Sequence, residues 1–157
     1  MSEQLIATQA KDTYETLCHT LDALEWSYNK CEEDLRIECY ARGEDLPIDI
    51  TVRVDAERML VLLISNIPFV VGEDKRLDVA IAVSAINNML VDGSFDFNIA
   101  TGQMFFRMTN SFIESKLSES VFAYMLYCSC ETVDAYNDKL LMIAKGMLSM
   151  ESFLASL

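Results

Sequence analysis

The run Ile48-Asp49-Ile50-Thr51-Val52-Arg53-Val54-Asp55 alternates apolar and polar side chains along its whole length. This alternation is typical of a strand that buries one face. A turn around residues 55–58 leads into Met59-Leu60-Val61-Leu62-Leu63-Ile64, in which every side chain is apolar. The two runs predict neighbouring strands joined by a short turn. The second strand should be covered on both faces, on one by the core and on the other by a further layer or a partner.

Strand patterns continue on both sides of this pair. Upstream, Leu35–Arg42 alternates in the same way, and Gly43-Glu44-Asp45 supplies the turn that follows it. Downstream, Ser94–Ile99 and Gln103–Thr109 are separated by a short segment that contains a glycine, which is a hairpin signal. The polar cluster Asn29–Asp34 breaks the pattern and is assigned to no strand.

Three helical segments flank the strands. Residues 5–24 carry leucines at helical spacing, and residues 74–91 are apolar nearly all round in their middle, which predicts a buried central helix. The third helix is expected to start after Ser118, a suitable N-cap, and to kink or end at Gly146. We interpret Asn87, near the end of the central helix, as a structural residue that bonds the next loop.

The order of these elements predicts the fold. It is helix, three strands, helix, two strands, helix, and a chain of 157 residues fits one domain spanning 1–157. Because most strand connections are short, the sheet should be mostly antiparallel. We therefore expect an α+β domain in which a mostly antiparallel five-stranded sheet packs against helices.

The charge balance limits the partners. There are 25 Asp and Glu residues against 12 Lys and Arg residues, for a net charge of −13, which repels nucleic acid and anionic membranes and favours a basic protein or peptide. Solubility explains the same charge equally well. The N-terminus lacks the pattern of a secretion signal, and the apolar runs are too short to span a bilayer. A soluble cytoplasmic protein is expected.

Residue types that carry out catalysis or hold metals lack supporting spacing. His19, the single histidine, follows Cys18, but neighbours on a helix point about 100° apart and do not form a catalytic pair. The cysteines show neither a disulfide framework nor a zinc pattern: they are Cys18, Cys31, Cys39, Cys128 and Cys130. We expect reduced thiols, no disulfide, no metal, no cofactor and no catalytic residue.

Several segments resemble a known bacterial family. They include an Asn near the end of a helix, a Gly before a Phe-bearing strand, and a hairpin ending in an aromatic–Arg step. The segments are 24–28, 46–52, 85–95 and 102–107. This pattern is similar to the YbjN family, which is associated with sensory transduction regulation, over residues 10–148. The resemblance implies a fold like that of type III secretion chaperones, which are homodimers that bind extended client segments. It implies no catalytic residues.

One outward row of side chains is the candidate binding site. The alternation of the strand 103–109 points two of its residues away from the core, and one face of 59–64 also has to leave the core. The candidate residues are Leu60, Leu62, Ile64, Phe105 and Arg107. An exposed apolar strip with a charged edge is typical of an interface, for a homodimer or for a client. In the alternative, the long C-terminal helix covers this strip within one chain.

The leading hypothesis is a non-enzymatic, homodimeric protein of chaperone or adaptor type that binds a protein or peptide client and acts in bacterial signalling. The second hypothesis is a regulatory domain that senses a small ligand in a pocket between sheet and helices. An enzyme of unrecognised chemistry is third. A large apolar cavity with convergent polar groups would favour the sensor, whereas a flat or grooved apolar sheet face would favour the chaperone.

Overall fold

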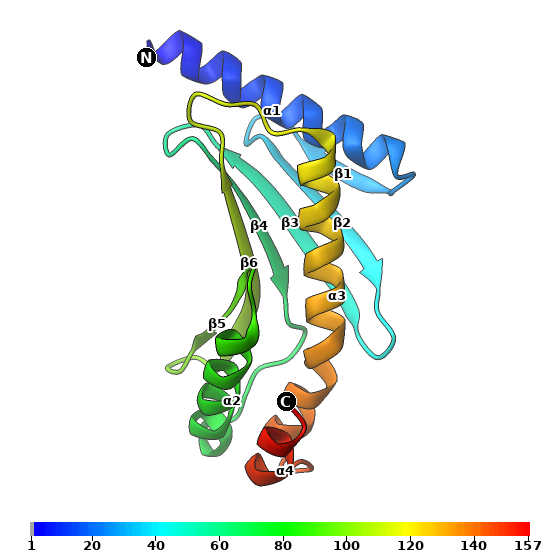
Figure 1. The fold of residues 1–157 in the computed structure, drawn as a ribbon, viewed down its shortest axis with the longest axis vertical. Helices are drawn as coiled ribbons and strands as arrows, with labels where there is room; N and C mark the ends of the chain where they lie inside the picture. Colours follow the sequence, from blue (N-terminus) through cyan, green and yellow to red (C-terminus); the bar gives the residue numbers. More distant parts are fainter. Residues whose placement is uncertain (1) are drawn as a thin grey trace.

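The computed structural model describes residues 2–157, which form a layer of strands and a layer of helices (Figure 1). Figure 1 shows α3 running along the sheet, α1 across one end, and α2 with α4 at the other end. In chain order the elements are α1 Glu3–Ala23, β1 Tyr28–Cys31, β2 Arg36–Arg42, β3 Pro47–Asp55, β4 Leu60–Asn66, the 3-10 helix η1 Glu73–Lys75, α2 Arg76–Met89, β5 Ser94–Asn98, β6 Gln103–Ser111, α3 Glu119–Ala144 and α4 Met150–Ala155. The predicted α+β class is confirmed.

The sheet has six strands in the order β1-β2-β3-β4-β6-β5, and every neighbouring pair is antiparallel. The prediction of five strands was therefore wrong by one, because β1 lies partly inside the polar cluster that was assigned to no strand. Asn29 and Lys30 of β1 are exposed, so the strand shows no apolar alternation. Its position depends on backbone pairing with β2, where Lys30 lies opposite Ile37.

The inner face of the sheet forms the core. Strands β2, β3 and β4 point side chains into this core. The exposed fraction is at most 1% for each of Ile37, Ile50, Val52, Val61 and Leu63. All four α-helices contribute buried side chains to the same hydrophobic cluster. The alternation read from the sequence is confirmed here. Burial also fixes the register, because a slip by one residue would exchange the two faces.

Helix α3 lies on the inner face of the sheet. Ser118 caps it as predicted, by accepting a hydrogen bond from the backbone N–H of Val121. In the core, the hydroxyls of Ser129 and of Ser65 on β4 are hydrogen-bonded at 2.6 Å, so these two buried polar groups satisfy each other. Gly146, with a φ of 70°, ends the helix in the left-handed conformation that glycine tolerates, which confirms its predicted role.

Helix α2 is not the buried central helix that its composition predicts. One face packs into the core through Val79, Ala82, Val83 and Ile86. The other face is open, because Leu77 is 70% exposed and Ile81 is 54% exposed. Figure 1 shows the cause: α2 lies at one end of the molecule, beside β5 and α4, and no other element of residues 2–157 lies outside it. Composition does not distinguish an enclosed helix from one with an apolar outer face.

Two asparagines on the helices have opposite environments. Asn87 donates to the carbonyl of Phe95 and accepts from its N–H, both at 2.9 Å, which confirms the predicted structural role. Asn137 in α3 is 0% exposed, and neither polar atom of its side chain has a hydrogen-bond partner within residues 2–157. A buried polar group without a partner costs about 1–3 kcal/mol.

Asn137→Leu should therefore raise the free energy of unfolding by about 1–3 kcal/mol, because an apolar side chain of similar size removes that cost. The matched control is Asn87→Leu, which leaves both backbone groups of Phe95 without partners and should lower the free energy of unfolding by about 1–3 kcal/mol. Equilibrium urea unfolding of both variants and the unsubstituted chain measures the changes. If Asn137→Leu lowered the free energy of unfolding as much as Asn87→Leu does, the conclusion that Asn137 is buried without a hydrogen-bond partner would be contradicted.

Candidate functional site

The outer face of the sheet is the face that no helix covers within residues 2–157. Along β2 to β6 its side chains alternate with the buried ones, and each of them is half-buried or exposed. Helix α3 packs on the opposite face, through Ser129 and the core. The alternative in which the long C-terminal helix covers the outward row is therefore wrong.

We name the apolar row on this face the outer strip and define it as Leu60, Leu62, Ile64 and Phe105. Each of these side chains is half-buried, because neighbouring strands shield its flanks while no helix among residues 2–157 lies above it. Within the β4–β6 register, Ile64 lies opposite Arg107, so the strip crosses from β4 towards β6. The structure thus brings the five residues that the sequence singles out onto one face.

Arginines border the outer strip on both sides. Arg53 of β3 lies opposite Leu62, and Arg107 of β6 lies opposite Ile64. The guanidinium of Arg107 forms an ion pair with Asp96 of β5 at 3.0 Å. An exposed pair of this kind adds little to stability, so it orients Arg107 more than it holds the sheet together.

A cavity of 470 Å³ opens beside the Phe105 end of the outer strip. Its walls combine the apolar loop after β4 with side-chain amides; they include Pro68, Phe69, Val70, Asn66, Asn98 and Gln103. The volume lies in the range of sites that hold a ligand or a large side chain. An apolar row that ends in such a cavity can accept an extended segment and anchor one of its larger side chains.

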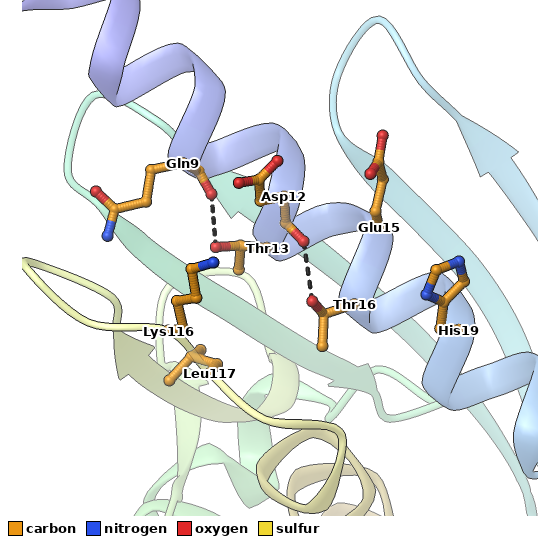
Figure 2. Close-up of a pocket in the computed structure, with 8 residues that line it drawn as sticks. All are labelled: Gln9, Asp12, Thr13, Glu15, Thr16, His19, Lys116 and Leu117. Carbon is orange, nitrogen blue, oxygen red and sulfur yellow. Dashed lines mark hydrogen bonds between the residues drawn. The ribbon is translucent and has the colours of Figure 1, made fainter.

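A smaller, polar cavity of 260 Å³ lies between α1 and the segment before α3 (Figure 2). Thr13 and Thr16 donate their hydroxyls to backbone carbonyls one turn earlier, at 2.8 and 2.9 Å, which satisfies both donors within the helix. Figure 2 shows His19 at the far end of the cavity from Lys116. Within residues 2–157, no group of three or more His, Cys, Asp or Glu side chains is placed to hold a metal ion.

The sequence matches the family model of YbjN, described as "Putative bacterial sensory transduction regulator", over residues 13–142. The chain belongs to the YbjN family. The match includes every strand of the sheet and therefore the whole outer strip. No curated protein matches the chain.

Solved structures share the fold of this YbjN-family chain. YbjN from E. coli has a TM-score of 0.60 at 17% identity and covers 85% of this chain and 92% of its own. A chain of the ExsC–ExsE complex has a TM-score of 0.59 at 16% identity, covering 82% and 93%. A chain of the HopA1–SchA chaperone–effector complex has a TM-score of 0.55 at 14% identity, covering 79% and 91%. The predicted chaperone-like fold is confirmed.

The cysteines of this YbjN-family chain are free thiols. Burial raises the pKa of Cys39 to about 12 and the pKa of Cys130 to about 11. Both thiols therefore stay protonated at neutral pH, and a protonated thiol is a poor nucleophile and a poor metal ligand. These side chains act as small apolar groups in the packing.

A second apolar surface lies on α2, and sequence reasoning missed it. We name it the α2 surface and define it as Leu77, Ile81, Ser84 and Asn88, which share one exposed helix face. Ser84 and Asn88 are polar, and their position on the same helix face as Leu77 and Ile81 was the sequence signal that this face is open. No charged side chain follows Asp78 in the helix. Within residues 2–157, neither α2 nor any other helix has the length and apolar content to cross a membrane.

Two adjacent leucines of β4 test the assignment of the faces. Leu62→Asp places a carboxylate on the outer face beside Arg53 and should lower the free energy of unfolding by about 1–2 kcal/mol. Leu63→Asp is the matched control. Leu63 is 1% exposed, so a carboxylate there should cost more than about 4 kcal/mol or prevent folding. Circular dichroism during urea unfolding measures both, and equal losses would show that the faces are wrongly assigned.

Proposed function

We propose that this YbjN-family chain is a non-enzymatic protein-binding domain of chaperone or adaptor type that acts in bacterial signalling. The observation that carries the proposal is the outer strip, an apolar row open to water on a sheet whose other face forms the core. Contiguous apolar surface left open on a folded chain commonly marks a binding site. The family's association with sensory transduction supports the signalling role.

Two solved neighbours support a protein partner. The ExsC–ExsE structure is a complex, and the HopA1–SchA structure is a complex of a chaperone with an effector. This chain has the fold of chains in both complexes. Because one fold can host many functions, the likeness supports the proposal without carrying it. The outer strip carries it.

The proposed client is an extended segment that crosses the outer strip. Leu60, Leu62 and Ile64 recur at every second residue, which is the period at which an extended segment presents side chains to one surface. One larger apolar side chain of the client would enter the 470 Å³ cavity beside Phe105. The net charge of −13 attracts basic clients over long range and so accelerates their encounter.

The proposal includes a homodimer formed through the α2 surface. Two copies of a chain with a net charge of −13 repel each other, and they approach most favourably where neither surface is charged. The α2 surface meets that condition and exposes Leu77 and Ile81. Pairing of one patch with its own copy is the commonest way to build a dimer. The sequence offered the outer strip as an interface for a homodimer or for a client, and pairing through α2 would leave that strip free for a client.

The thiols support binding in a reducing compartment. All five cysteines are free thiols, which suits the reducing environment of the cytoplasm. We therefore propose a cytoplasmic location. Raised pKa values of Cys39 and Cys130 favour a packing role for these two side chains over covalent chemistry. The proposed function therefore assigns the chain no reaction, metal or cofactor.

Charges introduced into the outer strip should abolish client capture. Leu62→Asp and Phe105→Asp should each weaken client binding by about 2–4 kcal/mol, since a carboxylate would be desolvated at the centre of an apolar interface. Affinity capture from native lysate followed by mass spectrometry identifies clients of the unsubstituted chain, and titration of a purified client gives the affinities.

Glu151→Lys on α4 is the control for a change of charge away from the outer strip, at an exposed position, and should retain the client. Circular dichroism establishes that each variant is folded. Folded Leu62→Asp and Phe105→Asp variants that bind the client like the unsubstituted chain would place the client site elsewhere and would contradict the proposal.

Ile81→Asp should convert a dimer into a monomer, because it places two carboxylates at the centre of the paired α2 surfaces. Light scattering should give about twice 17.8 kDa for the unsubstituted chain and 17.8 kDa for this variant. Leu62→Asp is the control on the other apolar surface and should remain dimeric. A monomeric unsubstituted chain, or a dimer lost only in Leu62→Asp, would reject pairing through α2.

A further inference from the structure

Strand β6 extends beyond its edge neighbour β5. Strand β5 begins at Ser94, opposite Arg107, whereas β6 continues to Ser111. On its other side β6 pairs with β4 along this whole extension, as far as the pair Leu60 and Ser111. The β5 side of residues 108–111 therefore has no strand beside it within residues 2–157.

The backbone groups of Thr109 and Ser111 point to this open side. At the two ends of β6, Ile67 donates its N–H to the carbonyl of Met104 at 3.2 Å, and Phe112 donates to the carbonyl of Met59 at 3.0 Å. The even-numbered positions thus face the β4 side. Since backbone groups alternate sides along an antiparallel strand, the N–H and C=O groups of Thr109 and Ser111 face away from β4. Both residues are exposed.

Gly93 lies where the chain turns from α2 into the start of β5. Its φ of 73° turns the chain as it leaves α2, and a Cβ at this position would clash with the ring of Phe106. Asn87 holds the next segment in place through its two hydrogen bonds to the backbone of Phe95. The start of β5 is therefore fixed by packing, and the edge of β6 beyond it is open as a consequence of the fold.

A cavity of 410 Å³ lies along the open edge. Its walls are mostly polar and include Asp92, Ser94, Arg107 and Asn110, with the buried Met108 and Met125 beside them. Tyr124 donates a hydrogen bond to Asp92 at its rim, and this bond raises the pKa of Tyr124 to about 12. The edge therefore combines unpaired backbone groups with space for a side chain of an added strand.

We propose that this edge of β6 docks an extended segment of a partner protein, which adds to the sheet as an antiparallel strand in line with β5 and places a side chain in the 410 Å³ cavity. The inference rests on the proposed protein-binding function and names the backbone edge that the client would use. Unpaired N–H and C=O groups are satisfied by another extended backbone. The proposed homodimer uses the α2 surface instead, and the net charge of −13 favours a basic segment as the occupant of this edge.

The register fixes which residues of the added strand bond to β6. A residue opposite Thr109 would form a hydrogen-bonded pair with it and would point its side chain to the outer face. A residue opposite Met108 would point its side chain into the cavity and its N–H away from β6. Alternate residues of the bound segment are thus distinguished both by side-chain environment and by backbone bonding.

The probe is a fluorescent heptapeptide amide, Lys-Thr-Val-Thr-Val-Thr-Lys, whose valines would point towards the cavity and whose threonines would point to the outer face. Fluorescence anisotropy with the full chain should show saturable binding. N-methylation of the threonines should weaken binding by about tenfold or more, because it removes the N–H groups that reach β6. N-methylation of the valines should change it little.

Substitutions at Thr109 provide the complementary test on the protein. Thr109→Pro removes the N–H that faces the open edge without breaking the ladder to β4, and it should weaken the peptide about tenfold or more. Thr109→Val keeps that N–H and should bind like the unsubstituted chain. Circular dichroism and the unfolding midpoint establish that both variants fold. The pair of methylated peptides tests the inference independently if Thr109→Pro does not fold.

Equal affinity of the two methylated peptides, unchanged affinity in a folded Thr109→Pro variant, or no saturable binding would each overturn docking at this edge. Loss of peptide binding in Leu62→Asp but not in Thr109→Pro would also overturn it, and would leave the proposed function intact by placing the segment on the outer strip. A dimer of the chain that Thr109→Pro dissociates would identify a second copy as the occupant and would equally reject the proposal.

Discussion

Strand β4 is apolar on both faces, and the arrangement of the other elements depends on which face is buried. Val61 and Leu63 enter the core, where all four α-helices pack, and the hydrogen bond between Ser65 and Ser129 fixes α3 on that side. With the helices on one face, the outer side chains of Leu60, Leu62 and Ile64 are only half-buried. Full burial of a Leu or Ile side chain is worth about 1.5–3 kcal/mol relative to exposure, so a partner that covers this row recovers part of that energy for each residue.

The same constraint separates two apolar surfaces. Helix α2 cannot lie over the centre of the inner face, which α3 occupies, and it packs at the end of the sheet beside β5 and α4. Its far side, with Leu77 and Ile81, is left open for the same reason that the outer strip is open: the described residues, 2–157, supply no further layer. Because the two surfaces lie on different elements, pairing of copies and capture of a client do not compete for the same side chains.

The sequence predicts features that depend on period and on local bonding. Alternation identifies the inner faces of β2, β3 and β4, and Ser118 and Asn87 act through partners close to them in the chain. Strand β1 shows no such signal, because an edge strand with exposed side chains is held by backbone pairing alone. The open face of α2 and the cavities depend on contacts between distant segments, such as Tyr124 with Asp92, which no local pattern encodes.

Arg107 joins the two parts of the proposed client path. Its side chain borders the outer strip, where it lies opposite Ile64, and it also lines the 410 Å³ cavity at the open edge of β6. A strand added at that edge would place alternate side chains on the outer face, next to Arg107, and a client continuing across the sheet would then meet Leu62 and Leu60. Each added backbone hydrogen bond contributes a net stabilisation of about 0.5–1.5 kcal/mol and is nearly independent of the client's sequence. The outer strip and the 470 Å³ cavity at its end instead discriminate between client side chains. The edge would therefore supply general affinity for extended segments, and the outer strip would supply the selectivity.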